Sequence, residues 1–138
     1  MKDDNCIFCK IAAGEIPSVT VYEDAYFKAI LDIAPAACGH TIIIPKDHFK
    51  DTTEITEEYS SRILAVATKI GKAQMAALGA DGFNVLQNNG RAAGQSVFHY
   101  HMHVIPRKEG DGVIEQWKTG APTADELAET ARKIGSNM

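Results

Sequence analysis

Three histidines alternate with large apolar residues in one short stretch, Phe98-His99-Tyr100-His101-Met102-His103-Val104-Ile105. A period of two predicts a β-strand, because successive side chains of a strand point to opposite faces of its sheet. The three imidazoles are therefore expected on one face, with the intervening apolar side chains on the other. Three of the chain's five histidines lie here, and aligned imidazoles suit ligands, nucleophiles or proton carriers better than core packing.

The composition indicates one globular domain with an ordinary core. The chain has 138 residues, of which 45% are hydrophobic, and these values argue against disorder. No apolar run is long enough to span a membrane, and the acidic start is no secretory signal, so we expect a cytoplasmic protein. A net charge of −4 argues against nucleic-acid binding. This net charge does not exclude a small phosphorylated ligand, because a pocket can be locally positive.

Turn signals and hydrophobic periodicity predict three strands, a long helix, two strands and a last helix. The strands are expected over residues 18–23, 26–31, 40–44, 82–87 and 98–105. Short connections favour an antiparallel five-stranded sheet with both helices packed on it, which is an α+β fold. We expect a single domain over residues 1–138, made of an N-terminal turn (6–14), a core (18–106) and a C-terminal extension (107–138).

Each predicted helix has its own start signal. Thr56 is a plausible N-cap for the long helix, which should end near Gly79. Its inward stripe is expected to be Tyr59, Ile63, Val66 and Ile70. Thr123 and Glu126 have capping-box spacing at the start of the last helix. The inward side of that helix is expected to be Leu127, Ala131 and Ile134.

The loop before the histidines, Asn88 to Ser96, contains two glycines and several hydrogen-bond donors. Glycines let backbone N–H groups point at an anion, and Gln95 and Ser96 add side-chain donors. An ordinary hairpin loop is the alternative interpretation. Beside a histidine strand, however, such a loop indicates phosphoryl chemistry. A neutral imidazole can attack phosphorus, the donors can stabilise the developing charge, and a second imidazole can protonate the leaving group.

The segment Gly94-Gln95-Ser96-Val97-Phe98-His99-Tyr100-His101-Met102-His103 resembles the signature of the histidine triad (HIT) family. The resemblance is to its Hint-like branch and extends from Cys6 to Pro106. It includes Cys6-Ile7-Phe8-Cys9-Lys10-Ile11, Glu15-Ile16-Pro17, Asp32-Ile33, Gly39-His40, Ile44-Pro45-Lys46 and Asn88. The resemblance implies a HIT-like fold, a homodimer and a nucleotide hydrolase or transferase acting on purine nucleoside phosphoramidates or related AMP or GMP esters.

The resemblance also implies a role for each site residue. His101 would be the nucleophile that forms a covalent nucleotidyl-histidine, His103 would contact the phosphate and leaving group, and His40 would fix the tautomer of His101. Phosphate oxygens would be held by Gln95, Ser96 and Asn88. Asp32 would bind the ribose hydroxyls. The purine would be walled by Phe8, Ile11, Ile30 and Ile33, for which plain core packing is the alternative.

A Cys-x-x-Cys turn, Cys6 and Cys9, supplies half of a tetrahedral zinc site. His48 and His99 are the candidates for the other half, and the resemblance supports a structural zinc on these four residues. A redox pair is the alternative interpretation of the two cysteines. The remaining cysteine, Cys38, receives no assigned chemistry.

Other functions remain open from the sequence. The three triad histidines could themselves hold a catalytic zinc. Alternatively, the protein could be a dinucleotide polyphosphate hydrolase or a non-catalytic nucleotide-binding regulator. The C-terminal extension departs from the eukaryotic Hint pattern, which leaves the leaving-group specificity open. Within that extension, Trp117 could pack at a dimer interface, at the pocket rim or in the core.

Overall fold

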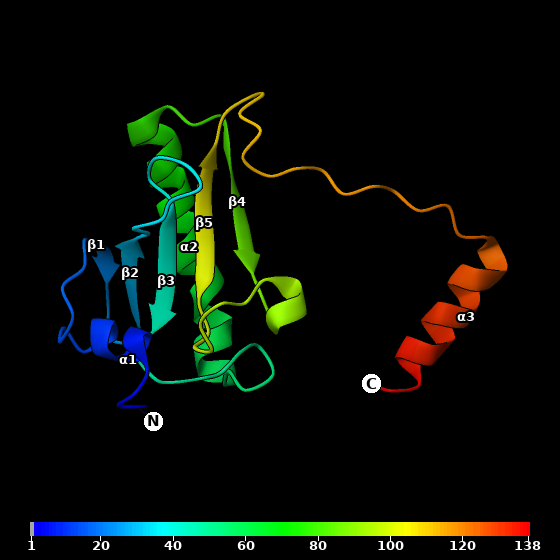
Figure 1. The fold of residues 1–138 in the computed structure, drawn as a ribbon, viewed down its shortest axis with the longest axis horizontal. Helices are drawn as coiled ribbons and strands as arrows, with labels where there is room; N and C mark the ends of the chain where they lie inside the picture. Colours follow the sequence, from blue (N-terminus) through cyan, green and yellow to red (C-terminus); the bar gives the residue numbers. More distant parts are fainter. Residues whose placement is uncertain (1) are drawn as a thin grey trace.

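The computed structural model describes residues 2–138 and contains a five-stranded antiparallel sheet in the order β1-β2-β3-β5-β4 (Figure 1). The strands are β1 (Thr20–Glu23), β2 (Phe27–Leu31), β3 (Thr41–Pro45), β4 (Gly82–Gln87) and β5 (Met102–Arg107). The helices are α1 (Ile7–Ala12), α2 (Glu57–Leu78) and α3 (Ala124–Gly135), with a short 3-10 turn at Arg91–Ala93. The predicted α+β class and antiparallel five-stranded sheet are confirmed.

The two faces of the sheet are covered by different helices. The long helix α2 packs on one face, and the short helix α1 lies against the other (Figure 1). The core under α2 includes the predicted stripe Tyr59, Ile63, Val66 and Ile70. The core under α1 is formed by Phe8, Ile11, Ile30, Ile42 and Ile44. The long helix begins after Thr56 and is followed by Gly79 in the left-handed conformation, as predicted.

Strand β3 lies at the centre of the sheet, and all five of its residues are buried. A strand that is covered on both faces needs the continuous apolar sequence that Ile42, Ile43 and Ile44 provide. Ile42 lies directly opposite His103 on β5, and opposed residues share a sheet face. The histidine face is therefore the face covered by α1.

The histidine strand begins later than the alternation predicts. The regular strand covers Met102–Arg107, so His99 and His101 lie in the extended segment that enters it. The alternation of faces is nevertheless confirmed: the rings of His99 and His101 contact Phe8 of α1, whereas Tyr100 and Val104 belong to the core under α2. Phe98 is the exception, because it is exposed beneath the guanidinium of Arg91.

The C-terminal helix does not pack on the sheet. The predicted capping box of Thr123 and Glu126 is present, but α3 has no buried residue. Leu127 and Ile134, which were expected to face inward, are 57% and 60% exposed. The segment that leads to α3 contains no helix or strand and carries it away from the body of the molecule (Figure 1). Periodicity identified an apolar stripe on this helix, but not the surface that covers it.

None of the helices within residues 2–138 combines the length and apolar character needed to cross a bilayer.

Candidate functional site

The ring of His101 is held by one nitrogen and leaves the other free. Nδ1 lies 2.7 Å from the backbone oxygen of His99, and because a carbonyl only accepts, Nδ1 carries the proton. Nε2 therefore keeps its lone pair. Among residues 2–138, the one buried side-chain nitrogen or oxygen without a hydrogen-bond partner is Gln74 Oε1. Nε2 of His101 also makes no hydrogen bond within that range, but it is not among the fully buried atoms without a partner. It must therefore keep some contact with solvent. This is the geometry required of a nucleophilic imidazole.

His103 has the opposite tautomer to His101, and His40 fixes it. The backbone N–H of Ala36 donates to His40 Nδ1 at 3.0 Å, so the proton of a neutral His40 is on Nε2. That Nε2–H donates to Nδ1 of His103 at 2.8 Å. The neutral His103 ring therefore carries its own proton on Nε2, where it can be donated to a ligand. The rings of His101 and His103 lie 5.0 Å apart, which places an acceptor nitrogen and a donor nitrogen side by side.

Burial keeps these rings uncharged at neutral pH. It lowers the pKa of His101 below its usual range, and the hydrogen bond to the His99 carbonyl opposes that shift. Burial, followed by the positive charge that His101 and His40 would carry, lowers the pKa of His103 to about 4. Burial likewise lowers the pKa of His40, although the carboxylate of Asp32 opposes it. The tautomers deduced from the hydrogen bonds are therefore those of neutral imidazoles.

His40 does not occupy the position that the sequence suggested. It was expected behind His101, fixing the tautomer of that ring, but its bonded partner is His103. The tautomer of His101 is set instead by a backbone carbonyl two residues earlier. The register explains the difference, because the start of β3 lies next to His103 on β5. The pairing of His40 with His103 spans 63 residues and has no local sequence signal.

Asp32 joins the same group from the end of β2. Its carboxylate accepts the N–H of Ala34 through Oδ1, and its Oδ2 lies 3.7 Å from His40 Nε2. Ligand atoms of Asp32, His40 and His103 lie within 4.8 Å of one another. Because His40 Nε2 carries a proton, this group is a hydrogen-bonded arrangement rather than a metal site. Asp32 is partly exposed, so its carboxylate can accept hydroxyl donors from a ligand.

The loop before the triad is shaped by Gln95. Its side-chain Oε1 accepts the N–H of Gly90 at 2.8 Å, and its Nε2 donates to the carbonyls of Lys50 and Val97. The Gln95 side chain is therefore committed to holding the loop closed. Ser96 is exposed and Asn88 is partly exposed, so these two side chains are open to a ligand.

The four apolar residues expected around the purine do not form one surface. Phe8, Ile11 and Ile30 are buried in the core under α1, whereas Ile33 is 99% exposed on the loop after β2. Phe8 packs edge-on against His101, with ring centroids 5.0 Å apart. Its evident contribution is to support the imidazole, and a purine contact for any of the four stays a prediction.

A second cluster brings together the four residues predicted to bind zinc. The ligand atoms of Cys6, Cys9, His48 and His99 all lie within 4.8 Å of one another. Cys6 Sγ lies 3.4 Å from His99 Nδ1, and Cys9 Sγ lies 3.4 Å from His48 Nδ1 and 3.5 Å from His99 Nδ1. Zinc bonds of the usual lengths at tetrahedral angles would place sulfur and nitrogen about 3.5 Å apart. The cluster therefore fits a tetrahedral zinc ion.

The tautomer of His99 also suits a metal ligand. Its Nε2 lies 3.0 Å from the backbone oxygen of Pro45, which leaves the Nδ1 lone pair directed at the two sulfurs. Donation of the second ring N–H to a carbonyl is the usual arrangement for a metal-bound histidine. Burial lowers the pKa of His99 to about 4, and burial raises the pKa of the Cys9 thiol. A divalent cation between the two cysteines would offset the cost of ionising the buried Cys9 thiol.

The triad as a whole cannot act as a three-histidine metal site. His99 faces the cysteines, His101 bonds to a backbone carbonyl, and His103 bonds to His40. Each ring therefore directs its nitrogens to different partners, and the expectation of a catalytic zinc on these three residues is not supported by the geometry.

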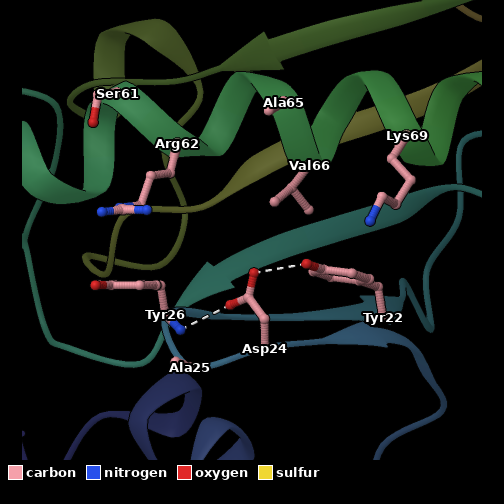
Figure 2. Close-up of a pocket in the computed structure, with 9 residues that line it drawn as sticks. All are labelled: Tyr22, Asp24, Ala25, Tyr26, Ser61, Arg62, Ala65, Val66 and Lys69. Carbon is pink, nitrogen blue, oxygen red and sulfur yellow. Dashed lines mark hydrogen bonds between the residues drawn. The ribbon is translucent and has the colours of Figure 1, made fainter.

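A separate cavity of about 470 Å³ lies on the other side of the sheet, between α2 and the β1–β2 turn (Figure 2). Figure 2 shows Arg62 and Lys69 reaching from α2 toward the rings of Tyr26 and Tyr22. Their cationic groups lie 4.5 and 4.9 Å from the ring centroids. None of the predicted site residues lines this cavity, so it is not part of the histidine site.

The fold and the two clusters define a class of small α+β protein in which a free imidazole nitrogen lies beside a cysteine–histidine site. The chain matches the HIT domain family over residues 13–110. It therefore belongs to the HIT family, and the resemblance seen in the histidine motif is confirmed.

Two curated relatives show how far the similarity extends. Protein hit of Bacillus subtilis is 47% identical over 136 residues, which cover 98% of this chain and 92% of the relative. Adenosine 5'-monophosphoramidase hnt1 of Schizosaccharomyces pombe is 40% identical over 135 residues, which cover 97% of this chain and 98% of the relative.

Solved structures agree with the fold over nearly the whole chain. A crystal structure of a HIT family member from Bacillus subtilis has a TM-score of 0.90 at 43% identity and covers 98% of both chains. A zinc-bound histidine triad family protein from Mycobacterium smegmatis has a TM-score of 0.77 at 37% identity, covering 97% of this chain and 98% of its own.

Proposed function

We propose that the protein is a hydrolase that cleaves the bond between the α-phosphorus and the leaving group of purine nucleoside 5'-phosphoramidates or related esters. The observation that carries this proposal is the free lone pair on Nε2 of His101, whose ring is held in place through Nδ1. A neutral imidazole oriented in this way is an effective nucleophile toward phosphorus. The name of the Schizosaccharomyces pombe relative, adenosine 5'-monophosphoramidase, supports the same class of substrate.

The reaction balances in two displacements. In the first, the bond between His101 Nε2 and phosphorus forms, the phosphorus–nitrogen bond of the substrate breaks, and the leaving amine takes its proton from water. In the second, water attacks the phosphorus, the nucleoside monophosphate leaves, and His101 is restored with release of a proton. The His103 Nε2–H and the Ser96 hydroxyl would donate to the non-bridging oxygens, where negative charge accumulates.

The ligand would be oriented by groups around the imidazoles. Asp32 offers a partly exposed carboxylate, an acceptor suited to the two hydroxyl donors of a ribose. Asn88 stands partly exposed at the start of the loop and could donate its amide to the phosphate. Of the four apolar residues predicted to wall the purine, Ile33 is exposed, on the loop after β2, and its side chain would be open to contact with a base.

We propose that Cys6, Cys9, His48 and His99 hold a structural zinc ion. A bound zinc would supply a cross-link that ties α1 to the segment entering β5. His99 would be fixed by this cross-link, and its backbone carbonyl holds the ring of His101. The proposal is supported by the three sulfur–nitrogen distances of 3.4 to 3.5 Å, by the convergence of the four ligand atoms within 4.8 Å, and by the zinc-bound relative from Mycobacterium smegmatis.

The function is tested by trapping the covalent intermediate. The protein is incubated briefly with an adenosine 5'-phosphoramidate labelled at phosphorus, quenched in base, digested and analysed by mass spectrometry. The expected result is one adenylyl group on the peptide that contains His101, with fragment ions placing it on that residue. Product formation without any covalent label, or label on His103, would contradict the proposed nucleophile.

We also propose that two copies associate as a homodimer in which α3 packs on the other copy. The helix exposes an apolar stripe, Leu127, Ala131 and Ile134, and a short helix without such packing is only marginally stable in water. Light scattering of Leu127→Glu/Ile134→Glu is expected to give the mass of one chain, against two for wild type. Ala128→Glu, outside the stripe, is expected to stay dimeric. A wild-type mass of one chain would contradict the proposal.

A further inference from the structure

Gln74 places a primary amide in the interface between α2 and the sheet, where its neighbours on the helix are mostly apolar. It lies one turn after Ile70 on the buried stripe and is 5% exposed. Burying an amide costs free energy unless its donors and acceptors find partners. The buried amide of Gln74 therefore depends on the polar groups that it contacts.

The amide joins the two central strands where their pairing ends. The β3–β5 ladder ends at the pair Thr41–Val104. Nε2 of Gln74 lies 3.0 Å from the carbonyl oxygen of Gly39 and 3.0 Å from that of Val104. Its two N–H donors thus reach two backbone acceptors, one on each side of the ladder end, and the Gly39 carbonyl also accepts from the Thr41 hydroxyl at 2.9 Å.

These two carbonyls belong to the neighbours of the histidine pair. Gly39 precedes His40, and Val104 follows His103. The side chains of His40 and His103 meet on the opposite face of the sheet through a bond of 2.8 Å. One amide on the α2 face therefore bridges the backbones that carry both rings.

Packing alone does not account for the choice of glutamine. Methionine would fill nearly the same space without an acceptor, whereas Gln74 leaves Oε1 as the one buried side-chain nitrogen or oxygen without a hydrogen-bond partner in residues 2–138. Leaving a buried acceptor unpaired costs free energy, because the acceptor loses its hydrogen bond to water. The amide is thus kept at a cost, and the bridge between the two carbonyls is what it provides.

We propose that Gln74 is a positioning residue for the His40–His103 pair. From the far face of the sheet it sets the separation of the two backbones, and so maintains the hydrogen bond that holds the proton of His103 on Nε2. The kinetic consequence of this inference rests on the proposed function, whereas its spectroscopic consequence does not.

The test compares Gln74→Met with wild type by NMR of the imidazole nitrogens. In wild type, Nδ1 of both His40 and His103 should show the shift of an unprotonated nitrogen. In the variant, which has no side-chain N–H donor, the shifts of His103 are expected to move to values averaged between its two tautomers. Gln74→Asn, whose amide is too short to reach both carbonyls, is expected to change the shifts in the same direction and provides a second variant if the first does not fold.

The matched control is Ile70→Met, which changes a side chain that is 3% exposed on the same helix face but makes no hydrogen bond to the sheet. With an adenosine 5'-phosphoramidate, both Gln74 variants are expected to lower kcat about tenfold with KM within about twofold, and the control to change neither. Unchanged His103 shifts in the Gln74 variants, or equal changes in the control, would overturn the inference. Absence of turnover in wild type would remove the proposed function, and the nitrogen shifts would still decide the role of Gln74.

Discussion

A His101→Asn variant is expected to lose turnover of an adenosine 5'-phosphoramidate, with kcat lowered by about 10⁴-fold or more. The asparagine amide can donate to the His99 carbonyl, as Nδ1 of the histidine does at 2.7 Å. It has no lone-pair nitrogen at the position of Nε2, so the covalent step has no nucleophile. Steady-state kinetics of product release, together with a thermal melt showing that the protein is folded, measure the effect.

His103→Asn provides the comparison for that variant. It keeps the nucleophile but removes one donor to the phosphate oxygens, so kcat is expected to fall by about 10²–10³-fold. Binding of 5'-AMP, measured by calorimetry, should remain within a few-fold of wild type in His101→Asn, because that ring contributes to the reaction more than to ligand binding. A His101→Asn protein that turns over within tenfold of the wild-type rate would contradict the proposed mechanism.

The sequence was most informative where chemistry and periodicity are local. A period of two placed three imidazoles on one face, and a helical stripe identified Tyr59 and Ile70 on the buried side of α2. The four residues of the cysteine–histidine cluster were also identified, because two of them lie in a short Cys-x-x-Cys turn and the others were supplied by family resemblance. Their convergence within 4.8 Å is consistent with that identification.

The sequence was least informative where a contact depends on the tertiary arrangement. The bond between His40 and His103 and the bridge made by Gln74 join residues that are distant along the chain, and no spacing rule connects them. Gln74 falls on the inward stripe of the long helix, where a lone polar residue interrupts the apolar pattern. That interruption was the available signal, but only the strand register shows which backbone carbonyls the amide meets.

The C-terminal helix shows another limit of periodicity. An apolar stripe indicates that a helix packs against something, and Leu127 and Ile134 were assigned to this chain's own sheet. The connection of α3 to the body is extended, and it leaves these residues exposed (Figure 1). Sequence alone cannot distinguish packing within a chain from packing between chains, because both need the same apolar face.

Loss of the proposed zinc site is expected to remove the bound metal and to destabilise the folded protein. Protein purified from zinc-containing medium should carry one zinc ion per chain, and Cys9→Ser should carry none. Cys9 is 4% exposed, and its sulfur approaches both His48 and His99. A structural zinc binds the folded state alone, so its loss should cost at least about 3 kcal/mol, or about 10 °C in Tm. Metal analysis and thermal melts measure both effects.

Cys38→Ser is the matched control, because Cys38 is exposed and lies outside the cluster; it should keep both the zinc and the wild-type Tm. Chelation then separates a structural ion from a catalytic one. The proposed nucleophile, His101 Nε2, is not among the ligands, so chelated protein held well below its lowered Tm should still turn over substrate. Activity that vanishes in chelated, folded protein and returns with zinc would contradict a purely structural role for the ion. Wild-type protein that carries no zinc when purified from zinc-containing medium, and that melts at the same temperature as Cys9→Ser, would contradict the proposed zinc site.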